Sequence, residues 1–291
     1  MEFLRWLERL RTPIGDTFFS AVTLLGEETL FIVAGLLFFW CINKRQGYFL
    51  LFVGFLGTVF NQFLKLLFRI PRPWVRDPSL TVVGDAKTAA TGYSFPSGHT
   101  MLATGFYGGL AVWQKKRGWF AGLCVFLTLL TAFSRNWLGA HTLEDVLVGI
   151  LSSCAVIAVN MFLLRWTDKQ KRNERIIFVA SMALFAALCL LYPTSLKTAG
   201  IYGGVMLGWF IERRFIGFEV KGSVLFRTGT FLVGILIVGV LYKIILPQLF
   251  AALDSNLSDM FSYFVVFLVI MAGWPCIIKL ALKRFKEKVN L

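Results

Sequence analysis

The chain is poor in the side chains that most enzyme sites are built from. Its 291 residues include only two histidines and 16 acidic residues, against 30 basic ones. Its five cysteines lie inside apolar runs and form no CxxC or Cys/His cluster, so the spacings typical of metal and disulfide sites are absent. No polar stretch between the apolar runs is long enough to fold as a soluble domain. The chemistry must therefore depend on very few residues.

Apolar residues dominate the composition. The chain is 57% hydrophobic, with a mean hydropathy of +0.71, whereas soluble domains are usually about 45–50% apolar. Several apolar runs approach the roughly 20 residues that a membrane helix needs. The net charge of +14 first suggests nucleic acid, but lysines and arginines that cluster in alternate loops fit the positive-inside rule better. We therefore predict an all-α, polytopic membrane bundle and no nucleic-acid partner.

The apolar runs predict nine membrane helices. Residues 1–11 have amphipathic spacing and predict a helix in the membrane interface. A short helix near 14–25 is interrupted at residues 26–28 and is not counted as a span. We expect a catalytic core with about five membrane helices at 1–167, and a region of about four further helices at 168–291. The predicted spans are 29–43, 47–69, 98–114, 118–134, 142–165, 175–193, 196–212, 225–246 and 259–281.

The loop charges predict the orientation. The first, third, fifth and seventh loops and the C-terminal tail are basic and fall on one side, so this side and the C-terminus are expected in the cytoplasm. The second and fourth loops contain both histidines and would face the periplasm, the exterior or a lumen. We expect the plasma (inner) membrane as the location. The second loop, 70–97, is the longest, and loops of this length are usually functional or disordered.

His141 and Asp145 are four residues apart. If a helix begins at about His141, the two share one helical face. The carboxylate can then accept a hydrogen bond from one ring nitrogen and leave the lone pair of the other free to attack. The alternative is an ordinary polar helix start, because Thr142 and Glu144 also favour a first turn. A histidine is not needed for that role, which favours the catalytic interpretation.

The string Pro96-Ser97-Gly98-His99 precedes a predicted membrane helix. Backbone amides at a helix start point at bound anions, and Gly98 allows a phosphate to approach the backbone. Ser97 adds a hydroxyl donor, and His99 is placed to give a proton to a leaving oxygen. Alone, this string also fits a common turn-to-helix junction.

Lys65, Arg72 and Arg135 supply positive charge near the histidines. A guanidinium can bind two phosphate oxygens and stabilise the charge of a transition state. Taken singly, the lysine also fits snorkelling to the interface, and the two arginines fit surface loops. A metal site built on both histidines and Asp145 is the competing interpretation. The arginines would repel a cation, so we expect neither metal nor cofactor.

Three strings together resemble the type 2 phosphatidic acid phosphatase (PAP2) family. They are Lys65-Leu-Leu-Phe-Arg-Ile-Pro-Arg72-Pro73, Pro96-Ser97-Gly98-His99, and Ser134-Arg135 through His141 to Asp145. All signature positions match, in order, and the resemblance covers roughly residues 1–165. It implies a metal-independent phosphatase that forms a phosphohistidine. His141 would be the nucleophile, Asp145 its orienting group and His99 the acid and base. The phosphate would be held by Lys65, Arg72, Ser97, Gly98 and Arg135.

The sequence leaves the substrate open. A lipid phosphate or diphosphate in the bilayer is the leading hypothesis: polyprenyl diphosphate, phosphatidylglycerol phosphate, phosphatidate or a sphingoid-base phosphate. A soluble sugar phosphate is not excluded. A lipid phosphotransferase with the same phosphohistidine, or a transporter or flippase built on this scaffold, are the alternatives. The four C-terminal helices have three open roles, which are packing, homodimer formation and shaping of the lipid entrance.

Overall fold

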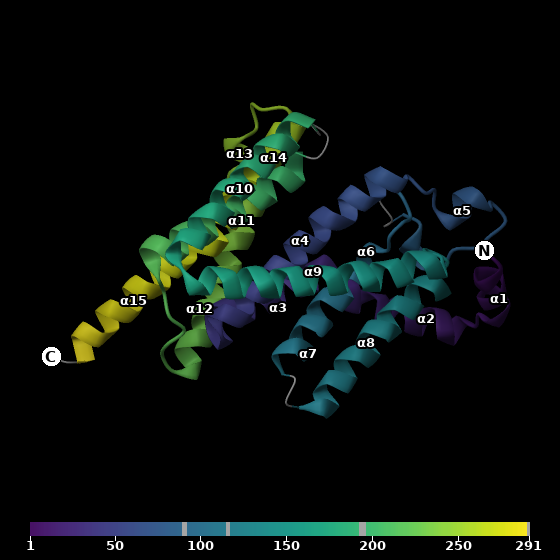
Figure 1. Cartoon of the computed structure of the whole chain (residues 1–291), viewed down its shortest axis with the longest axis horizontal. Helices are drawn as coiled ribbons and strands as arrows, with labels where there is room; N and C mark the ends of the chain where they lie inside the picture. Colours follow the sequence, from purple (N-terminus) through teal and green to yellow (C-terminus); the bar gives the residue numbers. More distant parts are fainter. Residues whose placement is uncertain (89–91, 115–116, 192–195, 290–291) are drawn as a thin grey trace. The chain divides into compact units, whose positions relative to one another are not determined.

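The computed structural model describes the backbone of residues 1–88, 92–114, 117–191 and 196–289, and every regular element in these ranges is helical (Figure 1). The η segments are short 3-10 (η1, η3) or π (η2, η4, η6, η7, η8) helices. The N-terminal elements are α1 (Glu2–Leu10), α2 (Pro13–Val22), η1 (Thr23–Gly26), α3 (Glu28–Leu37), η2 (Phe38–Ile42), α4 (Lys44–Phe68), α5 (Pro73–Arg76), η3 (Gly84–Ala86), α6 (Gly98–Ala103), η4 (Thr104–Gly108), α7 (Gly109–Trp113) and α8 (Gly118–Trp137). The remaining elements are α9 (Leu143–Lys169), α10 (Lys171–Leu191), α11 (Leu196–Ile211), η6 (Glu212–Ile216), α12 (Val224–Val240), η7 (Leu241–Ile245), α13 (Leu246–Leu249), α14 (Ser255–Leu268), η8 (Val269–Gly273) and α15 (Trp274–Val289).

A helix stands at each predicted span, so the predicted all-α membrane bundle is confirmed. Within the described residues, five helical stretches are long and apolar enough to cross a membrane: Lys44–Arg76, Gly118–Trp137, Leu143–Lys169, Val224–Leu249 and Ser255–Arg284. A bent pair, Pro13–Gly26 with Glu28–Ile42, is a sixth candidate. The predicted spans near 98–114, 175–193 and 196–212 form helices but are not among these candidates. Gly98–Trp113 is shorter than the roughly 20 residues of an upright span, and residues 192–193 lie outside the described part.

The chain divides into two compact units. The first comprises Met1–Gly35 with Arg45–Leu163, and the second comprises Leu36–Lys44 with Leu164–Leu291. All predicted site residues belong to the first unit. The second unit is held partly by close helix contact, because a methyl group on Gly200 or Gly204 of α11 would collide with the backbone of α14. Small residues at such positions are typical of membrane helix interfaces.

Polar contacts between helices organise the first unit. The Ser153 hydroxyl of α9 donates to the carbonyl of Met101 on α6 at 2.8 Å, and the Asn160 amide donates to the carbonyl of Phe49 on α4 at 2.9 Å. Helix α6 and η4 also pack on α8. Because apolar surroundings offer no water to satisfy these groups, such bonds fix the register of the helices. Helices α4, α6, α8 and α9 thus form one frame for the residues at their ends.

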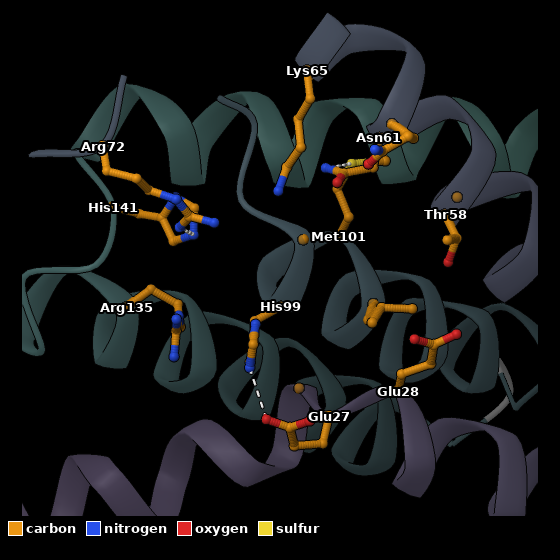
Figure 2. Close-up of a pocket in the computed structure, with 15 residues that line it drawn as sticks. Glu27, Glu28, Thr58, Asn61, Lys65, Arg72, His99, Met101, Arg135 and His141 are labelled. Atoms are coloured by element: carbon orange, nitrogen blue, oxygen red, sulfur yellow. Dashed lines mark hydrogen bonds and ion pairs between the residues drawn. The ribbon is translucent and has the colours of Figure 1, made fainter. Parts of the chain in front are cut away.

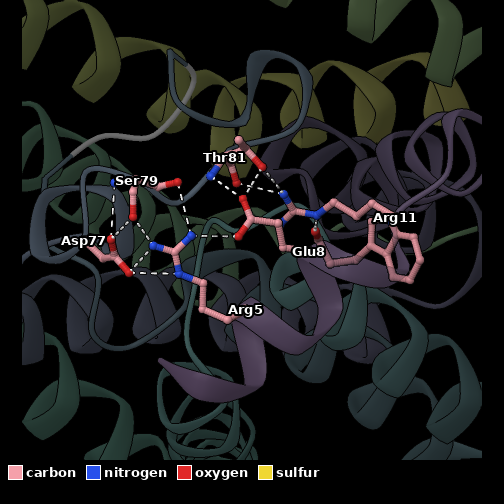
Figure 3. A network of polar contacts seen from close by, with 7 residues as sticks. Arg5, Glu8, Arg11, Asp77, Ser79 and Thr81 are labelled. Carbon is pink, nitrogen blue, oxygen red and sulfur yellow. Dashed lines mark hydrogen bonds and ion pairs between the residues drawn. The ribbon is translucent and has the colours of Figure 1, made fainter.

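Helix α1 is amphipathic, as the spacing predicts, and its charged face binds the long loop (Figure 3). Arg5 Nη2 lies 2.6 Å from Asp77 Oδ2. Glu8 Oε1 accepts from the Thr81 amide at 2.8 Å, and Arg11 Nη1 donates to the Thr81 carbonyl at 2.8 Å. The apolar residues of α1 are split, since Leu4 and Leu7 are buried while Trp6 and Leu10 stay exposed. The helix therefore clamps the loop that follows α5.

Candidate active site

A cavity of about 240 Å³ opens within the first unit, and most of the predicted site residues line it (Figure 2). Lys65 reaches into the cavity from α4, Arg135 comes from the end of α8, and His99 stands at the start of α6. Arg72 and His141 come from the loops before α5 and α9. Gly98 also lines the cavity, whereas Ser97 and Asp145 do not. The cavity continues to a wall formed by residues of α3 and α4, which include Glu28 and Thr58.

His141 lies just before α9 and not on its face, which corrects the expected helical spacing. The helix starts at Leu143, and a capping box forms there. Asp145 Oδ2 accepts from the Thr142 amide at 2.9 Å, and the Asp145 amide donates to the Thr142 hydroxyl at 3.4 Å. The same carboxylate oxygen lies 3.4 Å from His141 Nδ1. The polar helix start and the histidine–carboxylate pair, weighed as alternatives from the sequence, therefore coexist.

The other ring nitrogen of His141 faces Arg72. Arg72 Nη1 lies 2.9 Å from His141 Nε2. A guanidinium can only donate, so Nε2 must accept and the ring proton belongs on Nδ1, toward Asp145. Burial, reinforced by the charges of Arg72 and Arg135, holds the pKa of His141 well below its usual range, although the bond to Asp145 acts in the opposite direction. His141 is therefore neutral near neutral pH, with a lone pair on Nε2.

Ser94 completes the support of Asp145 and was not identified from the sequence. Its buried hydroxyl donates to Asp145 Oδ2 at 2.6 Å, and its amide donates to the Ile70 carbonyl at 2.8 Å. The Ser97 amide in turn donates to the Asp145 carbonyl at 3.0 Å. These bonds join the long loop and the starts of α6 and α9. No local pattern marks Ser94 as different from other loop serines.

Ser97 acts as the N-cap of α6. Its fully buried hydroxyl oxygen accepts from the amide of Thr100 at 3.4 Å and from the Thr100 hydroxyl at 3.0 Å. A contact between Ser97 Oγ and phosphate stays a prediction. Asn61 of α4 holds the preceding turn, since its Nδ2 donates to the Pro96 carbonyl at 3.1 Å. Asn61, one helical turn before Lys65, was also missed in the sequence.

His99 contacts a carboxylate that the sequence indicated only as part of a helix interruption. Its Nε2 lies 2.9 Å from Glu27 Oε1, and Glu27 stands between η1 and α3. The dashed line in Figure 2 marks this bond. The second histidine therefore also has a carboxylate partner, located 72 positions away in the chain.

Three cationic side chains are largely buried around the cavity. Lys65 is 9% exposed, Arg72 7% and Arg135 4%. Arg135 Nη1 donates to the Thr23 hydroxyl at 2.6 Å, but its buried Nε has no hydrogen-bond partner within the described ranges. Buried charges and unsatisfied donors are costly unless a partner of opposite charge compensates them. This arrangement is suited to an anion such as phosphate.

The donor set does not resemble a metal site. In the part of the chain that the structure describes, no group of three or more histidine, cysteine, aspartate or glutamate side chains is placed to hold a metal ion. The two carboxylates that contact the histidines are each engaged, Asp145 by the Thr142 amide and the Ser94 hydroxyl, and Glu27 by His99. The positive charges that line the cavity favour an anion over a cation there.

Comparisons with known proteins agree with this geometry. The PAP2 superfamily model matches residues 46–172, and the "PAP2 superfamily phosphatase, transmembrane extension" model matches residues 196–284. Undecaprenyl-diphosphatase BcrC of Bacillus subtilis (strain 168) is 33% identical over 115 residues, which cover 40% of this chain and 54% of that protein. A probable sphingosine-1-phosphate phosphatase of Dictyostelium discoideum is 25% identical over 202 residues, with 64% and 48% covered. Sphingosine-1-phosphate phosphatase 2 of Mus musculus is 27% identical over 214 residues, with 68% and 58% covered.

These matches extend beyond the three short motifs. The chain spans about half the length of the curated relatives that it matches, and no solved structure matches it significantly. The two family matches together cover more than half of the chain and include both the motif region and the C-terminal helices. The resemblance seen in the sequence is confirmed, and the chain belongs to the PAP2 superfamily.

Proposed function

We propose that this chain is an integral membrane phosphatase that removes phosphate from a lipid phosphate or diphosphate through a phosphohistidine on His141. The observation that carries the proposal is the cavity itself. A neutral imidazole nitrogen and a second, carboxylate-bound imidazole face the same buried group of three cations. An attacking lone pair, a proton donor and an anion site are the three components that phosphoryl transfer to histidine needs.

The first step transfers the phosphoryl group to the protein. As the phosphate enters, Arg72 turns from His141 Nε2 to the phosphate oxygens, which frees the lone pair. Nε2 attacks phosphorus and forms a P–N bond while the P–O bond to the leaving group breaks. His99, protonated at this stage, gives its proton to the leaving oxygen. Lys65 and Arg135 stabilise the charge of the transition state with Arg72. Asp145 accepts a hydrogen bond from Nδ1–H of His141 and stabilises the ring as it becomes positive, while the proton stays on Nδ1.

The second step releases phosphate and restores the protein. His99 is now neutral and takes a proton from a water molecule. The water oxygen attacks phosphorus, the P–N bond breaks, and the electron pair returns to His141 Nε2. The sum of both steps consumes one water and leaves His99 protonated for the next cycle. No metal ion is needed in either step, because the three cationic side chains supply the positive charge.

A lipid substrate is supported by the size and surroundings of the cavity. Pockets for drug-sized ligands are about 300–1,000 Å³, so about 240 Å³ holds a headgroup and not a whole lipid. A second gap, closed to water in this structure, shares Gly26, Glu27 and Leu102 with the cavity and continues between α3 and α6 along Leu30 and Phe31. We infer that the lipid tail leaves the site there when the side chains that line the gap move apart. The names of the relatives support a lipid phosphate, and a site that faces outward from the cytoplasm is part of the proposal.

The test is phosphate release by purified protein in detergent. The substrates are a panel of phosphatidate, phosphatidylglycerol phosphate, a sphingoid-base phosphate, a polyprenyl diphosphate and a soluble sugar phosphate, all with EDTA present. We expect turnover of at least one lipid and its loss in His141→Ala, with an unchanged melting temperature of the fold. Wild-type turnover by His141→Ala would refute the nucleophile, and activity abolished by EDTA would refute the metal-free mechanism. Label that appears on an acceptor lipid, and not as free phosphate, would identify a phosphotransferase instead.

A further inference from the structure

The break between α2 and α3 packs directly against His99. The two helical pieces, Pro13–Gly26 and Glu28–Ile42, meet at an angle of 47°. Gly26 packs so tightly there that a methyl group on it would come within 2.9 Å of both the His99 carbonyl and the Thr131 side chain. Only glycine allows this approach without a shift of the neighbours. The break therefore carries the backbone to the start of α6, and Glu27 is the next residue.

Two site residues, His99 and Arg135, form hydrogen bonds with side chains of this segment. Glu27 Oε1 lies 2.9 Å from His99 Nε2, and the Thr23 hydroxyl of η1 accepts from Arg135 Nη1 at 2.6 Å. Because Nε2 of His99 is engaged by the carboxylate, Nδ1 is the ring nitrogen that remains for the substrate. Glu27 is itself about half exposed, since its side chain lines the cavity. A carboxylate in this position serves the site more than the packing of the helices.

We propose that Glu27 is the positioning residue of His99: it binds Nε2–H, directs Nδ1 toward the leaving oxygen and stabilises the protonated ring that acts as the acid. This inference rests on the proposed phosphatase function and extends it. Glu27 does not touch phosphorus or the leaving group in this scheme. Its role is exerted through the ring, as in other sites where a third group orients a catalytic histidine.

The charges around His99 explain why the acid needs a carboxylate. Arg135 of α8 and Arg72 of the long loop face the ring, and Lys65 of α4 lines the same cavity. Nearby positive charges and partial burial both disfavour a protonated imidazole. Two carboxylates line the described cavity wall. Glu28 belongs to the first turn of α3, and the hydrogen bond of the His99 ring goes to Glu27. Glu27 therefore opposes the effect of the cations on the proton donor.

The first test is the pH profile of kcat/KM for Glu27→Gln, which keeps the shape and removes the charge. The first step needs protonated His99, so loss of the carboxylate should move the alkaline limb down by about one pH unit or more. Turnover at neutral pH should fall about 10- to 100-fold, which is less than a complete loss of acid catalysis. Glu27→Asp should restore part of both. An unmoved alkaline limb in Glu27→Gln would overturn the proposal.

A matched variant distinguishes the effect of the Glu27–His99 hydrogen bond from the electrostatic effect of any negative charge in the cavity. Glu28→Gln removes the neighbouring carboxylate, and we expect its alkaline limb to stay near that of the wild type. A shift as large as that of Glu27→Gln would overturn the specific role of Glu27. Circular dichroism melting of both variants shows whether either fails to fold, and in that case Glu27→Asp carries the test.

The second test does not depend on turnover. Because the chain has two histidines, labelling with ring-¹⁵N histidine gives two sets of ring signals, which His99→Gln assigns. The His99 signals should titrate at lower pH in Glu27→Gln than in the wild type, and Glu28→Gln should leave them in place. If no substrate is hydrolysed but this shift appears, the proposed function fails and the Glu27–His99 pairing stands. If the enzyme is active and the signals do not move, the pairing fails alone.

Discussion

Replacing Asp145 by asparagine tests how the nucleophile is oriented, because asparagine keeps the shape of the side chain and removes its charge. Three donors converge on one carboxylate oxygen, Oδ2. They are the Ser94 hydroxyl at 2.6 Å, the Thr142 amide at 2.9 Å and His141 Nδ1 at 3.4 Å. Since all three use the same oxygen, the carbonyl of an asparagine can accept from all of them. The tautomer of His141 should therefore survive the substitution.

The expected decrease in the rate of phosphohistidine formation in Asp145→Asn comes only from the loss of the negative charge. A hydrogen bond to a charged group contributes about 1.5–3 kcal/mol and a neutral one about 0.5–1.5 kcal/mol. The ring of His141, which becomes positive as it attacks, should lose about 1–2 kcal/mol of stabilisation by this difference. With about 1.4 kcal/mol per tenfold change, phosphohistidine formation should slow about 5- to 30-fold. A substitution that reversed the tautomer would cost far more, about 10⁴-fold.

The assay is single-turnover transfer of labelled phosphate from a lipid phosphate to the protein. The control is Asp168→Asn, which removes a carboxylate paired with Arg213 in the second unit and should keep the wild-type rate. A loss in Asp145→Asn close to that of His141→Ala would refute the reasoning from the shared oxygen. An unchanged rate would show that the charge of Asp145 does not act on the nucleophile.

Three further substitutions test the surroundings of the site. Gly26→Ala places a methyl group 2.9 Å from the His99 carbonyl. It should lower the activity, and it should lower the free energy of unfolding by about 1–3 kcal/mol. The matched control for thermal melting is Gly122→Ala, which lies in open space on α8. Asp77→Asn tests the clamp by α1: hydrogen bonds from Ser79 and Arg5 lower the pKa of Asp77, so its contribution is present above its ordinary pKa and is lost as the pH falls. Melting temperatures should therefore differ between variant and wild type near neutral pH and converge in acid, and a constant difference would contradict this. Leu30→Trp fills the gap proposed for the lipid tail at a residue that does not line the cavity. It should slow a long-chain lipid phosphate about tenfold or more, which corresponds to about 1.4 kcal/mol, while a short soluble phosphomonoester keeps its rate. An equal loss for both would refute the tail path.

The motif residues could be brought together from the sequence because their positions obey simple rules. Lys65 precedes the long loop, His99 starts a helix after it, and His141 precedes a later helix that starts on the same side. When consecutive spans alternate in direction, such ends meet on one face of the membrane. The helix starts were also predictable, since Ser97 and Thr142 are good capping residues. What the spacing could not give was the exact start of α9, which places His141 before the helix.

The supporting residues could not be found in this way. Ser94, Asn61 and Glu27 have partners 51, 35 and 72 positions away in the chain. Serine and asparagine are frequent in loops and helices, so nothing local distinguishes these two. Glu27 did carry a signal, because a carboxylate within an otherwise apolar segment is unusual enough to suggest function. In the sequence, it indicates only the interruption of a short helix that is not counted as a span.

In the proposed mechanism, the two carboxylates of the site, Asp145 and Glu27, pair with histidines that need opposite protonation states. A nucleophile must be neutral when the substrate arrives, whereas an acid must be protonated at the same moment, and sites that need both separate the two rings by their surroundings. Asp145 divides its charge among three donors and stands 3.4 Å from a fully buried His141. Glu27 stands 2.9 Å from a partly exposed His99. In the proposed mechanism, burial and the nearby cations keep His141 neutral, whereas Glu27 acts against the same two effects on His99 and supports the proton that the acid must carry. The placement of the two carboxylates is thus the difference on which the two proposed roles depend.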